Sequence, residues 1–398
     1  MKILFLSTWF PYPPNQGSRT RAYHLLRELA RRNEVGLVTF GDNFVRPEWM
    51  DHLQDLCALV EVVPQNPFGL DPRRAALGWF SSLPRSVYAG GSPEMAAVVR
   101  RVARDWKPEA VLAMTYVMAP YALGVPASRR VMDVDNLMAH MLGEDVRRTE
   151  WGPQRLRRTI AARKFRHYER ELYPRFDLSL VTSQLDVMRL RTYVPIRPGQ
   201  VGCVPNGVDI EHYRPTPAAE LPDSLIFPGA LTYEANRDAM TSFVREILPG
   251  VVQQVPTARL TITGSTEGVD LSDLQVNGHV TFSGYQDDIR PILTGSAVCV
   301  VPLRKGGGTR LKILEAMALG TPVVSTPKGA EGLDVVHGRH LMIAETPEEF
   351  TAATVSLLRH RGLRDHLSGN ARELVEQYYD WSKIGNELSR LIAGQEMQ

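Results

Sequence analysis

The chain has 398 residues, 46 Lys and Arg against 44 Asp and Glu, and a formal net charge of +2. This length is enough for two domains, and a composition of 43% apolar and 23% charged residues is typical of a globular protein. Such a balanced charge gives no argument for nucleic-acid binding, and the absence of an apolar run of about 18 residues argues against a membrane-spanning helix. Cys57, Cys203 and Cys299 are isolated, so we expect no zinc site and no disulfide framework, and a reducing cytoplasm fits.

The N-terminal residues show a strand, a loop and a helix in succession. The apolar run from Ile3 to Leu6 is too short for a signal peptide, and we expect a first strand over Ile3–Thr8. A Pro/Asn/Gly loop over 9–18, a helix over 19–32 and a strand over 35–40 should follow. This βαβ opening places the loop at the carboxyl end of the first strand, where ligands bind in doubly wound sheets.

The alternation of strands and helices continues to about residue 204. Residues 48–63 are expected to form a helix followed by a strand. Residues 64–92 are a Pro/Gly-rich loop with aromatic residues that either folds over a ligand or packs on the core. The further expected elements are a helix over 94–106 and strands over 110–114, 130–136, 176–183 and 200–204.

A basic segment lies between two of these strands, and it has helical propensity. It contains Arg147, Arg148, Arg155, Arg157, Arg158, Arg163, Lys164, Arg166 and Arg170. A basic helix can dock on anionic lipid headgroups or on an anionic acceptor, and a solvated helix face is the alternative.

The second half of the chain repeats the α/β pattern after a turn over 205–209 and a Pro/Ala-rich linker over 212–224. The expected strands lie at 224–227, 259–264, 280–284 and 297–301, and late helices lie at 350–358 and 371–378.

The clearest ligand-binding pattern follows the strand over 297–301. Three glycines at 306–308 allow a ligand to approach the backbone, and a helix is expected from about Thr309 to Gly320. A helix N-terminus after such a loop suits a phosphate. The spacing matches neither the P-loop nor the dinucleotide fingerprint, so neither an ATPase nor a dehydrogenase is indicated.

Charged side chains surround this glycine loop. Arg304, Lys305, Arg310 and Lys312 would add positive charge, and Glu315 shares a helix face with Lys312 because the two are three residues apart. That face would hold a cation for phosphate and a carboxylate that can accept from sugar hydroxyls. Incidental glycines and solvated charges are the alternative interpretation.

The stretch Gly-Gly-Gly-Thr-Arg-Leu-Lys-Ile-Leu-Glu-Ala-Met-Ala-Leu-Gly-Thr-Pro, from Gly306, resembles the donor signature of family-4-like retaining glycosyltransferases of the GT-B fold. The loop Pro-Pro-Asn-Gln-Gly-Ser-Arg-Thr-Arg, the hinge Pro-Asn-Gly-Val-Asp and the segment Tyr379-Asp380-Trp381-Ser382 also resemble that family. The resemblance implies two Rossmann-like doubly wound α/β domains facing across a cleft. An acceptor-side domain would span 1–210 with a crossover helix over 379–398, and a donor-binding domain would span 211–378.

The resemblance also implies residue roles. The expected catalytic residues are Lys312, Asp135 and Arg21, with a solvated helix start as the alternative for Arg21 and a helix cap as the alternative for Asp135. The expected donor-binding residues are Gly17, Gly229, Arg237, Gly264, Tyr285, Gly306, Gly307, Gly308, Thr309, Arg310, Leu311 and Glu315. Glu315 corresponds to the glutamate that binds the ribose hydroxyls in the family.

Two positions depart from the family pattern, and one short segment resembles a motif of another glycosyltransferase fold. Gly307 stands where the family has an earlier glutamate, and Ala230 stands where relatives often have an arginine. Asp133-Val134-Asp135 resembles the metal motif of the other large glycosyltransferase fold. We expect no metal and no cofactor, because the glycine loop and helix end already supply positive charge. If 130–136 is extended, Asp133 and Asp135 point to the same side, and His140 follows a few residues on.

The expected activity is transfer of a sugar from a nucleotide-sugar to an acceptor hydroxyl, as in the synthesis of a polysaccharide, a glycolipid or a natural-product glycoside. The rivals are a nucleotide-sugar 2-epimerase and a non-catalytic nucleotide-sugar-binding subunit. We expect a cytoplasmic protein with peripheral membrane contact through 147–170 and no nucleic-acid partner.

Overall fold

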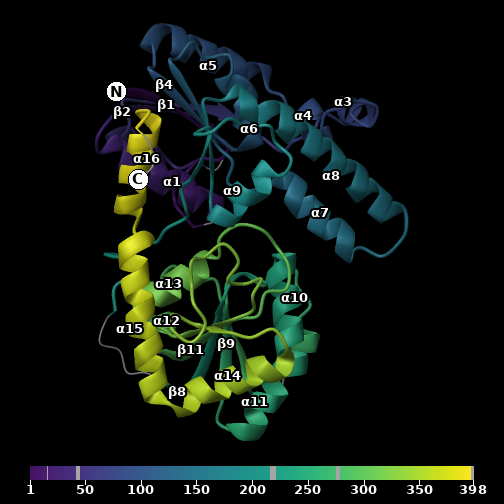
Figure 1. The fold of residues 1–398 in the computed structure, drawn as a ribbon, viewed down its shortest axis with the longest axis vertical. Helices are drawn as coiled ribbons and strands as arrows, with labels where there is room; N and C mark the ends of the chain where they lie inside the picture. Colours follow the sequence, from purple (N-terminus) through teal and green to yellow (C-terminus); the bar gives the residue numbers. More distant parts are fainter. Residues whose placement is uncertain (16, 42–44, 216–220, 275–277, 396–398) are drawn as a thin grey trace. The chain divides into compact units, whose positions relative to one another are not determined.

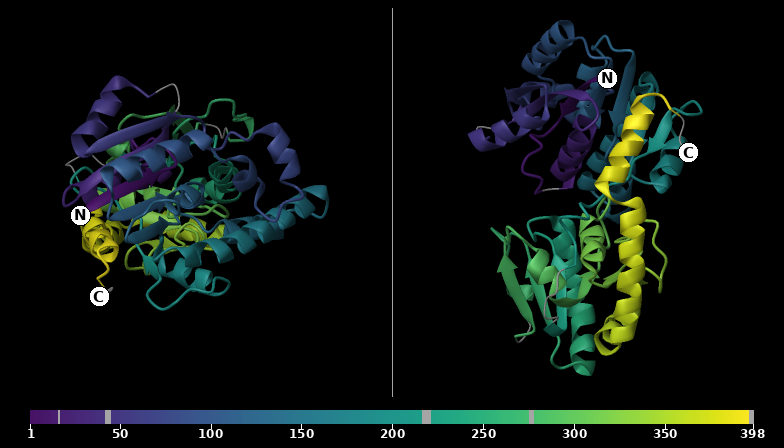
Figure 2. Two further views of the ribbon diagram at one scale, coloured as in Figure 1. Left: turned by 90° about the horizontal axis from the view of Figure 1, so that it is seen from above. Right: turned by 90° about the vertical axis from the view of Figure 1, so that its left-hand side faces the viewer.

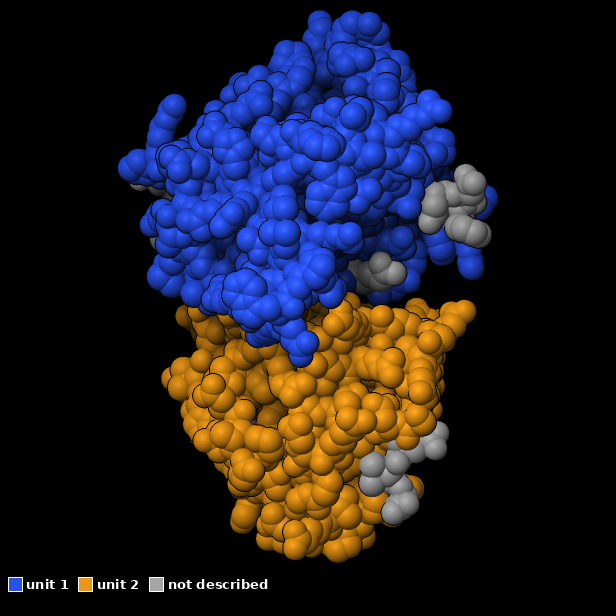
Figure 3. Space-filling model, turned by 90° about the vertical axis from the view of Figure 1, so that its right-hand side faces the viewer, with its two compact units in different colours: residues 1–205, 382–398 blue, residues 206–381 orange. Residues whose placement is uncertain are grey.

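The computed structural model describes residues 1–15, 17–41, 45–215, 221–274 and 278–395 (Figure 1). The chain divides into two compact units, coloured separately in Figure 3: unit 1 is Met1–Pro205 with Ser382–Gln398, and unit 2 is Asn206–Trp381. The boundaries expected from the sequence were 210/211 and 378/379. Each unit is built on one parallel sheet with helices, which confirms the expected two-domain α/β fold class.

Within the described residues of unit 1, seven parallel strands form one sheet in the order β3-β2-β1-β4-β5-β6-β7. The strands are β1 (Lys2–Ser7), β2 (Glu34–Gly41), β3 (Leu59–Pro64), β4 (Ala110–Met114), β5 (Arg129–Asp133), β6 (Leu178–Val181) and β7 (Val201–Cys203). The strand order reverses between β1 and β4, which are neighbours in the sheet. In doubly wound sheets ligands bind beyond the carboxyl ends of the strands at such a switch point.

The helices of unit 1 connect these strands. They are α1 (Gly17–Ala30), α2 (Pro47–Leu56), α3 (Pro72–Leu77), α4 (Arg85–Ala89), α5 (Pro93–Trp106), α6 (Thr115–Ala122), α7 (Met138–Arg148), α8 (Pro153–Leu172), the 3-10 turn Tyr173–Arg175 and α9 (Gln184–Arg191). Figure 1 shows α7 and α8 running side by side as a hairpin. The sequence had predicted helical structure throughout 147–170, but α7 ends at Arg148 and α8 starts at Pro153, because Gly152 and a proline that has no N–H cannot continue the helix from α7.

Within the described residues of unit 2, six parallel strands form a sheet in the order β10-β9-β8-β11-β12-β13. The strands are β8 (Leu221–Pro228), β9 (Arg259–Thr263), β10 (Val280–Gly284), β11 (Ser296–Val301), β12 (Val323–Ser325) and β13 (Met342–Ile343). The helices are α10 (Glu234–Ser242), the π-helical turn Phe243–Ile247, α11 (Leu248–Gln254), the 3-10 turn Ser272–Leu274, α12 (Arg290–Thr294), α13 (Leu311–Leu319), α14 (Pro347–Arg359) and α15 (Arg361–Tyr378). Here the switch point lies between β8 and β11.

The strands of unit 2 are buried on both faces, as expected for a parallel sheet covered by helices. Along β11, Val298 and Val300 pack into one apolar cluster, while Cys299 and Val301 pack into another. The helices α11 and α14 contribute to the first cluster, and α13 and α15 contribute to the second. The continuous apolar run that predicted this strand is therefore explained by burial of alternate side chains in two different cores.

The last helix returns to unit 1. Helix α16 (Trp381–Ile392) lies beside α1 (Figure 1 and Figure 2), and from Ser382 onward it belongs to the same unit as the N-terminus. A Cβ atom on Gly385 would stand 2.2 Å from Cβ of Glu28, so the glycine lets the two helices approach closely. Arg129 of β5 donates to the Leu391 carbonyl at 2.9 Å.

Most of the predicted elements are present within a few residues, and the following details also differ from the prediction. The loop expected over 64–92 contains the short helices α3 and α4. The strand expected over 130–136 ends at Asp133. The strand expected from residue 224 already begins at Leu221, and residues 216–220 of the expected linker lie outside the described residues. The short strand β13 was not predicted.

Candidate functional site

The glycines of the predicted donor site lie together at the carboxyl edge of the unit 2 sheet. Gly229 follows β8, Gly264 follows β9, and the loop with Gly306 follows β11. A Cβ atom on Gly264 would lie 2.5 Å from the Ala230 nitrogen, and one on Gly229 would lie 2.7 Å from Lys312 Nζ. Three loops from neighbouring strands therefore meet at the switch point of this sheet.

The loop after β11 adopts a conformation that depends on glycine. Gly306 has φ of 102° and Gly308 has φ of 73°, both in the left-handed region. Helix α13 begins at Leu311, two residues later than predicted, and it ends at Gly320 with φ of 79°, as predicted. No side chain caps its N-terminus. The N–H groups of Leu311 and Ile313 donate to the carbonyls of Thr309 and Arg310 at 3.1 and 2.9 Å, while the positive end of the helix dipole still favours an anion beside Thr309.

Three of the four cations predicted to surround the loop have partners within unit 2. Arg304 Nη2 lies 3.0 Å from Asp238 Oδ1, and Lys305 Nζ lies 2.8 Å from Glu234 Oε1, both acids being on α10. Arg310 is buried and its guanidinium donates to loop carbonyls, including that of Gly306 at 2.8 Å. These side chains fasten the loop, and the expected excess of positive charge is correspondingly reduced.

Lys312 is different from those three cations. Its Nζ donates to Asn236 Oδ1 at 3.0 Å and lies 4.0 Å from the centre of the Phe227 ring. No described acidic side chain forms an ion pair with it. Burial lowers the pKa of Lys312 to about 7, and the nearby Arg310 guanidinium contributes to the decrease. An anion bound at the start of α13 would reverse this effect by stabilising the charged ammonium.

Glu315 lies one turn further along α13, on the same face. Tyr213 donates to Glu315 Oε1 at 3.4 Å. Burial raises the pKa of Glu315, and Lys312 and the Tyr213 hydrogen bond oppose the increase. The carboxylate is only partly exposed, so it can accept hydrogen bonds from a ligand at this edge of the sheet.

The remaining predicted residues of unit 2 are less closely tied to α13. Arg237 donates to the Asp270 carbonyl at 3.2 Å, so it does not replace the arginine that is missing at Ala230. Tyr285 follows β10 and is 61% exposed. Asn236, which was not among the residues expected from the sequence, connects the site: it accepts from Lys312 and donates to the Ala230 carbonyl at 2.9 Å.

In unit 1 the predicted residues Arg21 and Asp135 occupy different environments. Arg21 is fully buried, and its Nε and Nη2 donate to the two oxygens of Asp133 at 2.9 and 2.5 Å. The guanidinium also donates to the carbonyls of Val204 and Pro205 at 3.0 and 3.2 Å. The solvated helix start weighed for Arg21 is therefore wrong, and the residue is an internal support.

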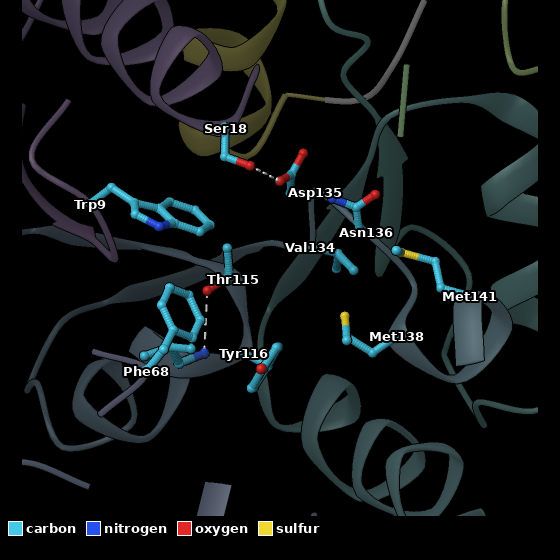
Figure 4. Close-up of a pocket in the computed structure, with 11 residues that line it drawn as sticks. Trp9, Ser18, Phe68, Thr115, Tyr116, Val134, Asp135, Asn136, Met138 and Met141 are labelled. Atoms are coloured by element: carbon cyan, nitrogen blue, oxygen red, sulfur yellow. Dashed lines mark hydrogen bonds between the residues drawn. The ribbon is translucent and has the colours of Figure 1, made fainter. Parts of the chain in front are cut away.

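Asp135 lies outside the strand, with φ of 56°, so the extended chain assumed for Asp133 and Asp135 is wrong. Ser18 Oγ donates to Asp135 Oδ2 at 3.0 Å (Figure 4). Burial raises the pKa of Asp135, and the Arg21 charge opposes the increase. Helix α7 is not capped by any side chain, so the helix-cap alternative for Asp135 is also wrong. Gly17, at the first position of α1, has open space where a Cβ would lie.

Solved structures share this architecture. The structure of the Anabaena protein HepE in complex with UDP and glucose matches with a TM-score of 0.69 and 18% identity, over 99% of this chain and 100% of that chain. At this level of identity the likeness shows the fold, which is the GT-B fold.

Two family models match the chain, "Glycosyltransferase Family 4" over residues 16–212 and "Glycosyl transferases group 1" over residues 222–360. The chain therefore belongs to the group 1 glycosyltransferases.

Two curated relatives match the chain over only part of their length. An uncharacterized 44.6 kDa protein in the cps region of Klebsiella pneumoniae is 25% identical over 170 residues, which are 40% of this chain and 44% of that protein. Mannosylfructose-phosphate synthase of Agrobacterium fabrum is 24% identical over 254 residues, which are 58% of this chain and 56% of the relative. The chain thus spans about half the length of these curated relatives. Among the described residues, none of the helices combines the length and apolar character required to span a membrane.

Proposed function

We propose that the chain transfers a sugar from a nucleotide-sugar donor to an acceptor hydroxyl, with retention of the anomeric configuration and without a metal ion. The observation that carries the proposal is the uncapped N-terminus of α13, which follows the glycine loop and has Lys312 in its first turn. This arrangement lies at the sheet edge where nucleotides bind in doubly wound folds. The UDP and glucose in the related Anabaena structure support the same class of ligand.

In the proposed reaction the bond between C1 of the sugar and the diphosphate oxygen breaks, and negative charge grows on that oxygen. The positive end of the α13 dipole and the Lys312 ammonium stabilise this charge. The acceptor oxygen forms its bond to C1 on the face that the diphosphate leaves. Its proton passes to the departing phosphate oxygen, so the reaction requires no protein base.

Glu315 is proposed to accept hydrogen bonds from the ribose hydroxyls of the donor. It lies one turn beyond Lys312 on the same helix face, which matches the extension of a nucleotide from its phosphates to its ribose. The hydrogen bond from Tyr213 orients the carboxylate before the nucleotide arrives.

Independence of metal ions is supported by the contacts of Asp133. Both of its carboxylate oxygens accept from Arg21, so this aspartate is engaged inside unit 1. We expect full activity in EDTA after removal of bound metal. Activity that is lost in EDTA and restored by Mn²⁺ or Mg²⁺ would contradict this part of the proposal.

The two rivals weighed on the sequence are not favoured, because both matched family models describe glycosyltransferases. The direct test begins with thermal unfolding of the full chain in the presence of UDP-, GDP-, TDP- and ADP-sugars, since a true donor stabilises the protein by mass action. Release of nucleoside diphosphate that depends on an added acceptor then identifies a transferase. Release that needs no acceptor and forms no glycoside would contradict the transferase proposal. NMR of the glycoside establishes its anomeric configuration and so tests retention.

We also propose that unit 1 binds peripherally to an anionic membrane surface, with the protein in the cytoplasm. Around the α7–α8 turn, Trp151 is 88% exposed and Arg155 stacks 4.2 Å from its ring centre. Lys164 of α8 donates to the carbonyls of Gly78 and Trp79, so the segment with the 93% exposed Phe80 is fixed to this hairpin. None of the basic residues of 147–170 forms an ion pair with a described side chain, which leaves their charge available to lipid phosphates.

The membrane proposal is tested by sedimentation with phosphatidylcholine vesicles with and without 40 mol% phosphatidylglycerol. We expect binding to the anionic vesicles that weakens with salt and is reduced severalfold by W151S together with F80S. Tyr378→Ser, an exposed aromatic position in unit 2, is the matched control. Equal binding of the double variant and the unchanged chain would exclude this surface.

A further inference from the structure

A cavity of about 230 Å³ lies at the switch point of the unit 1 sheet. It is bounded by residues within two positions of the carboxyl ends of three strands, namely Trp9 after β1, Thr115 after β4 and Val134 after β5. Because β1, β4 and β5 are adjacent in the sheet, this is the position at which a doubly wound fold binds a ligand.

The cavity is lined mostly by apolar groups. Figure 4 shows the aromatic residues Trp9 and Phe68 on one side of it and Met138 and Met141, from the first turn of α7, on the other. The ring centres of Trp9 and Phe68 are 5.8 Å apart, and Val134 lies between the two sides. Aromatic and thioether groups adapt well to apolar ligands and offer few hydrogen bonds.

Five lining residues, Ser18, Thr115, Tyr116, Asp135 and Asn136, carry polar side-chain groups, but most of the lining surface is apolar and several of these groups already have partners. Thr115 Oγ1 lies 2.8 Å from Thr8 Oγ1, and Ser18 donates to Asp135. A pyranose ring has hydroxyl groups around its whole edge, and burying those hydroxyls without partners is costly. By volume the cavity exceeds the roughly 150 Å³ cavity that is known to bind benzene. It therefore suits one ring or a short alkyl segment with a single hydroxyl.

The backbone around the cavity is held in an uncommon conformation. Thr115 has φ of 66° and Asp135 has φ of 56°, and they are two of the four non-glycine residues with positive φ in the described chain. For a β-branched residue such as Thr115 this is a strained geometry, and such strain gathers at functional sites. In this geometry Asp135 is placed in the cavity wall beside Ser18.

We infer that the acceptor of the proposed transfer reaction carries an apolar portion next to the reacting hydroxyl, and that this cavity binds that portion. The apolar portion packs between Trp9, Phe68 and the two methionines, and Asp135 accepts a hydrogen bond from the hydroxyl. An aromatic aglycone and the alkyl part of a lipid share this chemistry. The inference rests on the proposed function, because only a transferase has an acceptor. Binding of an apolar ligand to the cavity can be tested without any donor.

The test uses the full chain labelled with ¹³C at the methionine methyl groups. NMR spectra are recorded while 2-phenylethanol, 1-butanol, 1-hexanol or methyl glucoside is added, and the signals are assigned with Met138→Leu and Met141→Leu. We expect the alcohols to shift the signals of Met138 and Met141 in a saturable way and to leave Met317 of unit 2 unchanged. Methyl glucoside should have no effect.

The two sources of the apolar group give different affinities. For a lipid chain, each added methylene from butanol to hexanol should tighten binding about fourfold. For an aromatic aglycone, 2-phenylethanol should bind more tightly than hexanol. Filling the cavity with Met141→Trp, at a partly exposed helical position, should weaken binding of every alcohol at least tenfold.

The result that overturns the inference is an absence of saturable shifts at Met138 and Met141 with every alcohol, or equally tight binding of methyl glucoside. If the shifts occur but no donor is ever consumed, the cavity assignment stands and the transferase proposal fails. If transfer occurs to polar acceptors while the methionine signals stay unchanged, the transferase proposal stands and this inference fails.

Discussion

Lys312 Nζ donates to Asn236 Oδ1 at 3.0 Å, while Nδ2 of the same asparagine donates to the Ala230 carbonyl at 2.9 Å. One amide thus fixes the ammonium at the start of α13 against the loop that follows β8. A lysine side chain is ordinarily mobile, and here it is held in place before any ligand binds. Stabilisers that are fixed in advance act most strongly on charge that grows during the reaction.

We therefore expect Lys312→Ala to lower turnover by about 100-fold, with a smaller effect on donor affinity. Asn236→Ala should reduce turnover by a smaller factor than Lys312→Ala does. Asn236→Asp should have turnover closer to that of the unchanged chain, because a carboxylate also orients the ammonium. Steady-state kinetics on folded variants measure these effects, with the exposed Lys383→Ala as the matched control. Unchanged turnover in Lys312→Ala would show that the lysine does not act on the diphosphate.

Donor binding should depend on pH through Lys312. Its pKa is about 7 in the free protein, and the groups that face it are Arg310, Glu315 and Cys299. A bound diphosphate favours the ammonium and raises this pKa, so affinity should be greatest near pH 7 and should decrease at higher pH. Between pH 7 and the higher pKa of the complex, affinity should fall by up to tenfold per pH unit.

Titration calorimetry of nucleoside diphosphate binding from pH 7 to 9 tests this dependence, and buffers of different ionisation enthalpy report the proton that is taken up. Lys312→Arg should remove both the slope and the proton uptake, because an arginine stays charged throughout this range. The same slope in that variant would assign the titration to another group.

Glu315→Ala should weaken binding of the nucleoside diphosphate by about 2–3 kcal/mol, because charge-assisted hydrogen bonds to the ribose are lost. Tyr213→Phe should cost less, since it removes only the hydrogen bond that orients the carboxylate. The same calorimetry with 2′-deoxy nucleotides should show a smaller difference in affinity between the unchanged chain and the Glu315→Ala variant. Exposed Glu373→Ala serves as control, and an unaltered preference for ribose in Glu315→Ala would remove the assignment.

Alanine substitutions at two glycines of unit 2 distinguish the effect of backbone strain from that of a steric clash. Gly264 and Gly268 both have positive φ, 96° and 69°, but only the Cβ of Gly264→Ala would meet backbone, 2.5 Å from the Ala230 nitrogen. Both alanines should cost about 1 kcal/mol through the left-handed backbone. Gly264→Ala should in addition displace the loop after β8 and weaken nucleotide binding at least tenfold, whereas Gly268→Ala should bind normally. Equal binding by both variants would contradict the convergence of loops at this site.

Unit 1 contains a buried carboxyl group with its own pH dependence. Glu169 of α8 accepts from Tyr193 at 2.6 Å and from the Ala139 N–H of α7 at 3.3 Å, and burial raises its pKa to about 7. Because the folded pKa is higher than the unfolded one, the associated stability is complete below about pH 4.5 and is lost as the pH rises through 7.

We expect the free energy of unfolding to decrease by about 2–3 kcal/mol from this group between pH 5 and 8. In Glu169→Gln this part of the decrease should vanish. Urea denaturation of both proteins at several pH values makes the comparison. Parallel pH profiles would mean that Glu169 is ionised in the folded protein at all these values.

The sequence indicated the sheets and the glycine loop well because their signals are local. The run Ala297–Val301 and the stop at Gly320 depend on neighbouring residues, and both are found where they were expected. Arg21 shows the opposite case. It was expected to reach a ligand, but it pairs with Asp133, which is 112 residues away in the chain. No local pattern contains that contact.

Asn236 was missed for a similar reason. Its neighbour Arg237 carries the charge that a search for phosphate ligands favours, yet Arg237 bonds to a carbonyl and Asn236 holds the lysine. The neighbouring acids Glu234 and Asp238 had no assigned purpose in the sequence, and they neutralise two of the loop cations. Charge counted along a chain overstates charge at a site whenever a facing helix supplies partners.

Helix α16 makes the order of synthesis matter. Its residues from Ser382 onward belong to unit 1, but the ribosome produces them only after all of unit 2. Until then the surface of α1 around Glu28, against which Gly385 packs closely, stays uncovered. Unit 1 therefore completes its packing last although most of it is made first, and a released chain that ends at residue 381 would have a complete unit 2 and an unfinished unit 1.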